Sequence, residues 1–332
     1  MLVVDGAIRA ADQEWTLDRT GRRVPGPESD ARRAAIALGL GRAGGSVIVA
    51  ESDDAELMSL LQVAHTPDYI AFLRDWTTKL PAGELRMPRG WSAPGVPPDT
   101  PVHRRVWTEA FESARVALAA ARAVAAGQRV AYGLCRPPGH HAGPDWAGGY
   151  CFLNNAAVAV LALGSHGRKP GVLDLDFHVG NGTAAILART GTSIYASVHA
   201  ATAGHYPWQA ELAGVSADNC VEFSVPPSGG QYLAAVGSLV ERLAGHGVDT
   251  LVLSLGFDAI RGDPHGGWSL PPSIYRPVAA LLSRPGWPVC VIQEGGYRLD
   301  ALTDCAEIFG RGLAGTPQRE GCGPSKGQNL HG

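Results

Sequence analysis

The stretch VLDLDFHVGNGT, from Val172 to Thr183, decides how this chain can be interpreted. An apolar run carries Asp174, Asp176 and His178 at alternate positions and then breaks into a Gly-Asn-Gly turn. Alternate side chains of a strand share one face, so two carboxylates and an imidazole are predicted to converge at the end of a buried strand. Burying two carboxylates is costly unless a cation or strong hydrogen bonds compensate them, and a divalent metal is the simplest compensation. The stretch therefore predicts a metal site.

The composition indicates a soluble globular protein without strong electrostatic bias. Of 332 residues, 45% are hydrophobic and 18% charged, and the formal net charge of -3 gives no nucleic-acid footprint. The six cysteines form no CxxC pair, which favours reduced thiols over a disulfide framework. The N-terminus lacks the pattern of a secretory signal, and no apolar stretch is long enough to cross a bilayer. We therefore expect a cytoplasmic protein without membrane or nucleic-acid partners.

Apolar, strand-like runs alternate with helix-like stretches along the chain. The predicted strands cover residues 46–50, 130–134, 171–175, 193–198, 220–225, 250–255 and 288–292. The predicted helices cover residues 29–38, 67–77, 103–126, 154–163, 231–245, 273–283 and 299–313. Several strand runs are almost continuously apolar, as is typical of parallel strands buried on both faces. The alternation predicts a three-layer α/β domain with a mostly parallel central sheet.

No linker or composition shift divides the chain, so residues 1–314 are predicted to form a single domain. Residues 80–102 carry many Pro and Gly and few periodic apolar residues, which predicts a long irregular loop. Loops of that length in compact domains tend to be functional or disordered. Residues 315–332 are rich in Gly, Pro and polar residues and are predicted to be a flexible tail.

Four of the predicted strands lead into unusual turns. In open α/β sheets, active sites gather at the carboxyl ends of the strands. The turns are CRPPGHH (135–141), the opening stretch, GFDAIRGDPHGG (256–267) and QEGGY (293–297). Together they are predicted to place a set of polar side chains on one rim: His140, His141, Asp176, His178, Asp258 and Tyr297.

Asp176, His178 and Asp258 make a chemically sensible set of metal ligands. Three protein ligands that leave a position open are typical of catalytic Zn²⁺, and two oxygens with one nitrogen also suit Fe²⁺ or Co²⁺. The alternative is a hydrogen-bond network at the strand ends that holds no metal. We favour the metal because two separate segments supply carboxylates beside a histidine pair.

The pair His140-His141 follows a rigid Pro-Pro-Gly turn, which favours a positioned acid and base over an incidental surface pair. A metal-activated water needs a base to accept its proton and an acid to protonate a leaving amine. Asp174 and Asn181 are candidates to orient the two imidazoles. Tyr297 has a hydroxyl that can stabilise an oxyanion, although packing against the turn explains this residue about equally well.

At these residues the chain resembles the histone deacetylase and acetylpolyamine amidohydrolase superfamily. The matching segments follow in order along most of the chain: RPPGHHAG (136–143), GGYCFLNNAAVA (148–159), DLDFHVGNGT (174–183), SLGFDAIRGDP (254–264) and EGGY (294–297). Weaker similarity extends to PGPESDARRA (25–34) and HTPDYIAFL (65–73). The resemblance is strongest to the bacterial acetylpolyamine amidohydrolase-like deacetylases, and it implies an arginase/deacetylase-type fold.

The resemblance also implies a role for each residue of the rim. Zn²⁺ would be bound by Asp176, His178 and Asp258. The catalytic residues would be His140 and His141, backed by Asp174 and Asn181, with Tyr297 polarising the scissile carbonyl. The acyl-amine tunnel would be walled by Gly149, Tyr150 and Tyr206. A structural K⁺ would be held by groups of Asp174, Asp176, His178, Ser197 and Val198. Homo-oligomers are also implied, because many bacterial members form dimers or tetramers.

The chain departs from the family pattern at three places. Val179 replaces the second His of the usual HHGNG turn, and His265 stands where relatives carry an apolar or an acidic residue. The segment from Lys79 to Arg105 contains five basic and two acidic residues. If that segment borders the tunnel, it is expected to repel a polycationic ligand. With His265 in the substrate site, this argues against acetylspermidine and favours an acetyl-lysine-like side chain or an N-acylated small metabolite.

The sequence therefore predicts a metal-dependent deacylase of N-acylated amines, a class that includes acetyl-lysine, acetylated polyamines and small metabolites. Two alternatives stay open. One is an arginase-like ureohydrolase with two Mn²⁺ ions on a related fold. The other is a non-catalytic relative that binds acylated ligands, for which Val179 is the only support.

Overall fold

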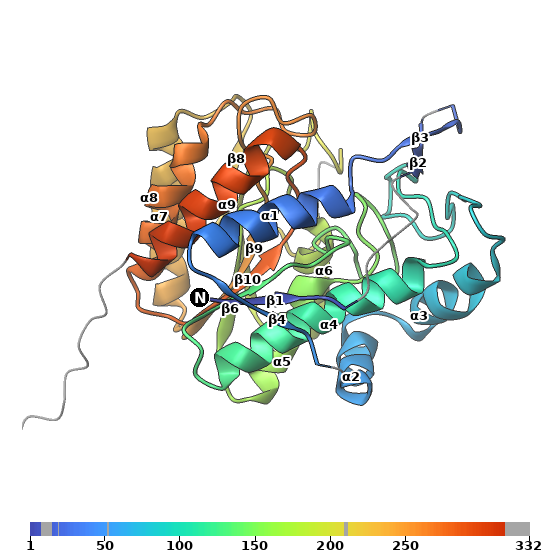
Figure 1. Ribbon diagram of the computed structural model, residues 1–332, viewed down its shortest axis with the longest axis horizontal. Helices are drawn as coiled ribbons and strands as arrows, with labels where there is room; N and C mark the ends of the chain where they lie inside the picture. Colours follow the sequence, from blue (N-terminus) through green and yellow to red (C-terminus); the bar gives the residue numbers. More distant parts are fainter. Residues whose placement is uncertain (8–14, 19, 52, 209–211, 316–332) are drawn as a thin grey trace, which may run out of the picture.

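A parallel eight-stranded sheet forms the centre of the molecule in the computed structural model (Figure 1). The residues described are 1–7, 15–18, 20–51, 53–208 and 212–315. The strand order is β4-β1-β5-β10-β9-β6-β7-β8, and every neighbouring pair is parallel. The strands are β1 (Leu2–Asp5), β4 (Ser46–Val49), β5 (Val130–Gly133), β6 (Pro170–Asp174), β7 (Ile194–Ala200), β8 (Cys220–Phe223), β9 (Thr250–Leu255) and β10 (Val289–Gln293). A separate antiparallel hairpin joins β2 (Trp15–Leu17) to β3 (Arg23–Pro25).

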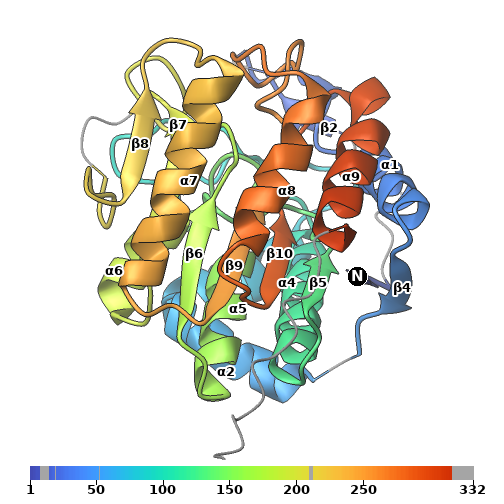
Figure 2. The ribbon, with the colours of Figure 1, turned by 90° about the vertical axis from the view of Figure 1, so that its left-hand side faces the viewer.

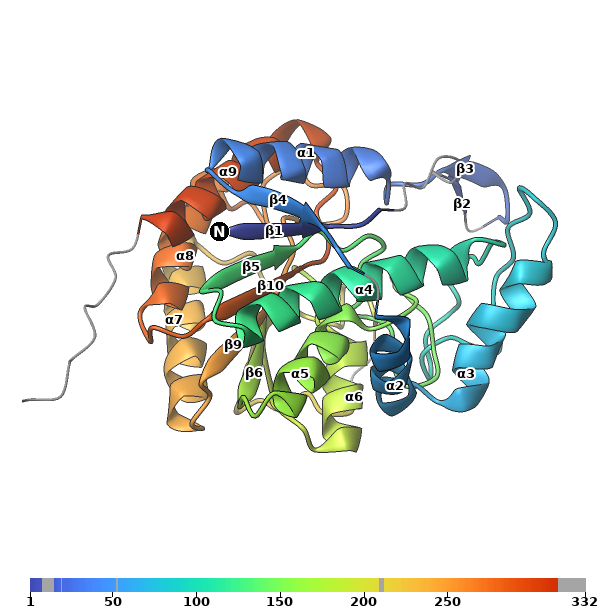
Figure 3. The ribbon, with the colours of Figure 1, turned by 60° about the horizontal axis from the view of Figure 1, so that its bottom comes forward.

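Helices cover both faces of the sheet, which gives the three predicted layers (Figures 2 and 3). One face carries α1 (Asp30–Arg42), α7 (Gly229–Gly245), α8 (Tyr275–Ser283) and α9 (Leu299–Ala314). The other carries α4 (Val106–Ala125), α5 (Asn155–Ser165) and α6 (Asn181–Thr190), with α2 (Asp54–Ala64) and α3 (Pro67–Ala71) beyond them. A π-helical turn, Phe72–Trp76, continues α3. None of the described helices is both long and apolar enough to span a membrane.

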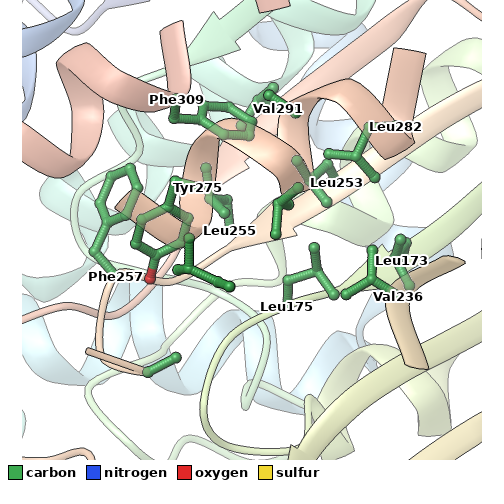
Figure 4. Packing of buried hydrophobic residues seen from close by; sticks show 14 of the residues in the cluster. Leu173, Leu175, Val236, Leu253, Leu255, Phe257, Tyr275, Leu282, Val291 and Phe309 are labelled. Carbon is green, nitrogen blue, oxygen red and sulfur yellow. The ribbon is translucent and has the colours of Figure 1, made fainter. Parts of the chain in front are cut away.

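Two apolar cores sit on the two faces of the sheet. Leu173 and Leu253 pack toward α7, α8 and α9, as Figure 4 shows for their cluster. Their sequence neighbours Val172 and Val252 point the opposite way, into the core beneath α4 and α5. Because adjacent residues of β6 and β9 are buried on opposite faces, these strands need continuous apolar sequence, as the composition of the runs predicted.

The seven strands and the main helices predicted from the sequence are confirmed, with ends shifted by a few residues. The interpretation of the opening stretch is wrong in one respect. β6 ends at Asp174, so Asp176 and His178 lie in the loop after the strand instead of on its face. The predicted Gly-Asn-Gly turn is also wrong, because Asn181 begins α6.

The loop after β6 has its own physical basis for bringing these side chains together. Asp174 accepts a hydrogen bond from the backbone N–H of Asp176 at 3.1 Å, and Asp176 accepts one from the N–H of His178 at 2.9 Å. Asp258 accepts a third from the N–H of Phe177 at 3.0 Å. Carboxylates thus replace the ladder bonds that the chain loses on leaving the sheet.

The segment predicted as a long irregular loop is ordered by contacts with the rest of the domain. Arg86 and Val102 exchange two backbone hydrogen bonds, and Ala147 donates a third to the carbonyl of Trp91. Ala93 and Val96 pack against Tyr206. The loop therefore has a fixed position beside Tyr206. Of the predicted flexible tail, residues 316–332 lie outside the described part of the chain.

Candidate active site

The carboxyl ends of β5, β6, β9 and β10 meet at one edge of the sheet, and the four unusual turns converge there. They line a pocket of about 430 Å³. Its lining includes the predicted catalytic and tunnel residues His140, His141, Gly149, Tyr150, Asp176, His178, Tyr206, His265 and Tyr297. Asp258 lies directly beneath this pocket, fully buried, with its carboxylate close to His178. The structure thus brings together the side chains that the turns were predicted to place on one rim.

Asp176, His178 and Asp258 form a compact group of ligand atoms, each within 4.8 Å of the others. His178 Nδ1 lies 3.3 Å from Asp176 Oδ1 and 3.4 Å from Asp258 Oδ2. Asp258 Oδ2 is buried and receives no hydrogen bond from the residues that the structure describes. Burial, together with the neighbouring Asp176 carboxylate, raises the pKa of Asp258 above its usual value. A buried acceptor without a donor, next to a second carboxylate, fits a divalent cation bound by two oxygens and one nitrogen.

The two histidines of the pair have different partners. His140 Nδ1 lies 3.1 Å from Asp174 Oδ2, whereas His141 Nδ1 lies 2.8 Å from the amide oxygen of Asn181. Burial alone lowers the pKa of His140, but the carboxylates of Asp176 and Asp174 outweigh it and raise that pKa to about 10. Burial and the nearby imidazoles of His140 and His178 hold the pKa of His141 well below its usual value. His140 is therefore paired with a carboxylate and His141 with a neutral amide, and the pKa values of the two imidazoles are shifted in opposite directions.

Glu294 holds the turn that carries the histidine pair. Its Oε2 accepts the N–H groups of Gly139 at 2.8 Å and His140 at 3.1 Å, and its Oε1 accepts the hydroxyl of Ser254. Glu294, His140 and Cys151 also form a second group of ligand-type atoms within 4.8 Å. Burial raises the pKa of the Cys151 thiol far above its usual value, and the Glu294 oxygens are already engaged. This second group is therefore a hydrogen-bonded scaffold.

Tyr297 is fixed from three sides, although its residue type alone left its role open. Asp263 Oδ2 accepts its backbone N–H at 2.7 Å. The guanidinium of Arg32 lies 4.4 Å above its ring centroid, and the ring of His265 stands 4.5 Å away. These contacts favour a positioned hydroxyl at the pocket over simple packing against a turn.

The walls of the pocket explain why a glycine precedes Tyr150. Gly149 has a φ of +52°, and a Cβ placed there would lie 2.2 Å from Cδ2 of His141. Tyr150 itself has a φ of +68°, a conformation that non-glycine residues seldom adopt. The carboxylate of Asp99 accepts the N–H of Gly149 at 3.2 Å and anchors this strained pair. The wall opposite is Tyr206, whose ring centroid lies 4.5 Å from that of His141.

The predicted potassium ligands are also brought together. Asp174 and Ser197 are direct partners across β6 and β7, and Val198 is the next residue of β7. Asp176 and His178 follow Asp174 within one short loop. The Ser197 hydroxyl lies 2.9 Å from Nδ1 of His199.

The long loop borders the pocket, as the electrostatic expectation assumed, but not through its basic residues. The residue of that segment that lines the pocket is the acidic Asp99. Arg86 is paired with Glu84, and Arg105 is paired with Glu109 at 3.5 Å. Arg89 borders an adjoining outer cavity and not the pocket itself. The net positive charge of the segment therefore does not exclude polycationic ligands from the pocket.

Val179 lies away from the pocket. Its side chain is fully buried in the apolar core on the α4 and α5 side of the sheet. The departure from the usual family sequence therefore changes the packing beneath the site and leaves its polar groups in place.

Comparison with known proteins agrees with this geometry. The histone deacetylase domain model matches residues 27–313. The chain belongs to the histone deacetylase family. It is 33% identical over 324 residues to the acetylpolyamine amidohydrolase of Mycoplana ramosa, covering 89% of this chain and 94% of that protein. Acetylpolyamine amidohydrolase 1 of Pseudomonas aeruginosa is 38% identical over 212 residues, a match that spans 61% of each protein.

The fold of this family member matches solved structures as well. A crystal structure of acetylpolyamine aminohydrolase from Burkholderia pseudomallei superposes with a TM-score of 0.82 at 29% identity, covering 94% of this chain and 99% of that one. The HD domain of HDA15 superposes with a TM-score of 0.74 at 27% identity, covering 94% and 91%. The predicted arginase/deacetylase-type fold is confirmed.

Several residues that build the site were missed as functional residues in the sequence. Arg32, Asp99, Asp263 and Glu294 hold Tyr297, Gly149 and the His140 turn in place. Three of them lie inside or beside segments already singled out by the resemblance. For Asp99, Asp263 and Glu294 the usable signal was a charged residue next to glycine or proline outside a helix. Arg32 lies within α1 and carries no such signal.

Proposed function

We propose that this protein is a zinc-dependent amidohydrolase that removes an acyl group, in particular acetyl, from an N-acylated amine. The proposal rests on one observation above all. The orphaned Oδ2 of Asp258 shares a compact group with Asp176 and His178, directly beside a histidine pair and Tyr297. Bound zinc would polarise the acyl carbonyl and make water a stronger nucleophile near neutral pH.

The side chains of the pocket supply the remaining steps. His141, held neutral beside Asn181, is the principal base that accepts a proton from the attacking water. His140, paired with Asp174, is suited to keep a proton and donate it to the leaving amine. The Tyr297 hydroxyl donates a hydrogen bond to the oxygen on which negative charge develops. The acylated chain would lie between Tyr150 and Tyr206.

The finer assignments follow the same reasoning. Zn²⁺ is the proposed metal, and Fe²⁺ or Co²⁺ would suit the same ligands. We assign a structural K⁺ to Asp174, Asp176, His178, Ser197 and Val198. Acetyl-lysine-like, polyamine and small-metabolite substrates all fit a pocket that contains Asp99 and lacks Lys and Arg among its described lining residues. A cytoplasmic location and homo-oligomers stay predictions.

Turnover of zinc-loaded protein on N-acetylated amines tests the proposal. Loss of one oxyanion donor is expected to lower kcat by about 100- to 1,000-fold in Tyr297→Phe. The matched control is Tyr232→Phe, because the Tyr232 hydroxyl is buried in the apolar core and has no hydrogen-bond partner in the described part of the chain. Tight ligand binding without turnover in the zinc-loaded wild type would instead support the non-catalytic relative.

A further inference from the structure

A second, larger cavity adjoins the active-site pocket. This outer cavity has a volume of about 690 Å³ and shares Asp99 and Trp208 with the pocket. Its described lining residues come from the β2–β3 hairpin, from the loop before α4 and from Trp208 after β7. Its volume is in the range of binding sites for small molecules, and it shares a wall with the pocket of the proposed chemistry.

The lining of the outer cavity is mainly apolar. Leu17, Met87, Pro97, Pro98 and Trp208 supply side chains to it. Trp208 is half exposed and has a φ of +55°; apart from Tyr150 it is the only non-glycine residue with positive φ in the described part of the chain. Strained backbone tends to persist where a side chain must be held in one place. The indole ring lies 5.2 Å from the ring of Tyr206 at the junction of the two cavities, which favours an apolar or aromatic ligand group.

Three charged side chains line the outer cavity, Asp18, Arg89 and Asp99, and they differ in whether other residues already bind them. Asp18 accepts hydrogen bonds from Thr20 and from the backbone and guanidinium of Arg22, so its carboxylate is engaged in the hairpin turn. Asp99 is occupied by the N–H of Gly149 and the hydroxyl of Thr100. Arg89 is exposed, and none of the described residues forms a salt bridge with it. Arg89 is therefore the charge that a ligand in this cavity can use.

We infer that the outer cavity is a specificity subsite for the amine side of the substrate. It would take an apolar or aromatic group that carries a carboxylate, with the ring against Trp208 and Met87 and the carboxylate on Arg89. Arginine is suited to this role because its guanidinium binds a carboxylate through two parallel hydrogen bonds. The inference rests on the proposed function, since the acyl end must lie in the pocket.

Three acetylated amines with the same acyl chain test the subsite. Nα-benzoyl-Nε-acetyl-lysine carries both the ring and the carboxylate, its C-terminal amide lacks the carboxylate, and N-pentylacetamide lacks both. We expect kcat/KM to fall about tenfold or more at each of these two steps. Arg89→Gln should abolish the preference for the acid over its amide, and Met87→Ala should reduce the preference for the benzoylated amide over N-pentylacetamide.

Arg104→Gln is the matched control, because it removes one exposed guanidinium from the same segment without touching the cavity. It should preserve all three ratios. Equal kcat/KM for the three compounds, or a preference that survives Arg89→Gln, would overturn the subsite while leaving deacylation intact. Dissociation constants of the same compounds, measured calorimetrically on zinc-loaded Tyr297→Phe, decide the question without turnover. Equal affinities there would refute the subsite even if the proposed chemistry fails.

Discussion

At the scale of single residues, the site depends on side chains that orient other side chains. Asn181 is the clearest example, because its amide oxygen is the acceptor for Nδ1–H of His141 at 2.8 Å. Asn181→Ala would leave this N–H without a partner and the imidazole free to rotate. We expect kcat to fall about 10- to 100-fold, as when other orienting partners of catalytic imidazoles are removed. Steady-state kinetics with a constant zinc content would show this.

Measuring kcat and KM separately distinguishes an orienting role of Asn181 from a purely structural one. Asn181→Asp keeps an oxygen acceptor at the same position, so it should recover much of the kcat lost in Asn181→Ala. The KM is expected to change little in either variant, since Asn181 is not among the residues that line the pocket. A fall in zinc content that matches the fall in activity would show that Asn181 supports the metal group instead.

At Val179 we expect a substitution to lower stability and to leave activity unchanged. Its side chain is fully buried among apolar neighbours. Val179→Thr keeps the shape but buries a hydroxyl where the wild type has a methyl group. We expect a loss of about 1–3 kcal/mol in the free energy of unfolding, measured by denaturant titration. Zinc content and kcat should match the wild type, and a loss of either would mean that this position reaches the metal group.

At the scale of elements, the sequence predicted the sheet better than its connections. Continuous apolar runs identified β5, β6, β9 and β10 because parallel strands buried on both faces leave little choice of residue. Strand β1 was missed because its apolar run is only Leu2–Val4 and ends at the charged Asp5. Helix α2 was also missed, although the side chain of Asp53 caps it by accepting the N–H of Glu56.

In the candidate site, too, residues within short sequence motifs could be predicted, whereas contacts between distant segments could not. The proposed metal ligands and the histidine pair lie in short motifs, so residue type and spacing sufficed to propose them. The contacts of Arg32 with Tyr297 and of Asp99 with Gly149 join segments far apart in the chain. Periodicity and turn chemistry report only on neighbours along the sequence, and such contacts become visible only when the sheet brings the loops together.

His65 connects the end of α2 to the segments of Gly143 and Asn154, and its burial makes stability depend on pH. At the end of α2, its Nδ1–H donates to the carbonyl of Gly143 at 2.8 Å, and its Nε2 accepts the N–H of Asn154 at 3.0 Å. Burial lowers the pKa of His65 from 6.5 to about 4. The stabilisation from neutral His65 is therefore complete above pH 6.5 and is lost as the pH falls toward 4, by on the order of 3 kcal/mol.

The His65→Gln variant checks this pH dependence. Its free energy of unfolding should be lower than that of the wild type at pH 7, and the difference between the two proteins should shrink between pH 6.5 and 4. Replacing the exposed His246, at the end of α7, by Gln should preserve the wild-type slope. A constant difference between His65→Gln and wild type over this range would rule out titration of His65.

At the scale of the whole molecule, the proposed metal joins two connections of the central sheet. Asp176 and His178 follow β6, and Asp258 follows β9, so a bound ion would tie neighbouring strand ends together. Without it, two buried carboxylates face each other. Removal of metal by a chelator should therefore lower the Tm, and added zinc should restore it. An ion at about 100 times its Kd stabilises the fold by about 2.7 kcal/mol.

Asp258→Asn distinguishes this linkage from nonspecific effects of zinc. The substitution replaces one of the two facing carboxylates, a proposed metal ligand, by a neutral amide. In the absence of metal, its Tm should equal or exceed that of the wild type, whereas saturating zinc should reverse the order because the wild type gains more. Elemental analysis should find one tightly bound zinc per wild-type chain. Two bound Mn²⁺ ions with urea-forming activity would favour the ureohydrolase, and equal zinc-induced shifts in both proteins would place the metal elsewhere.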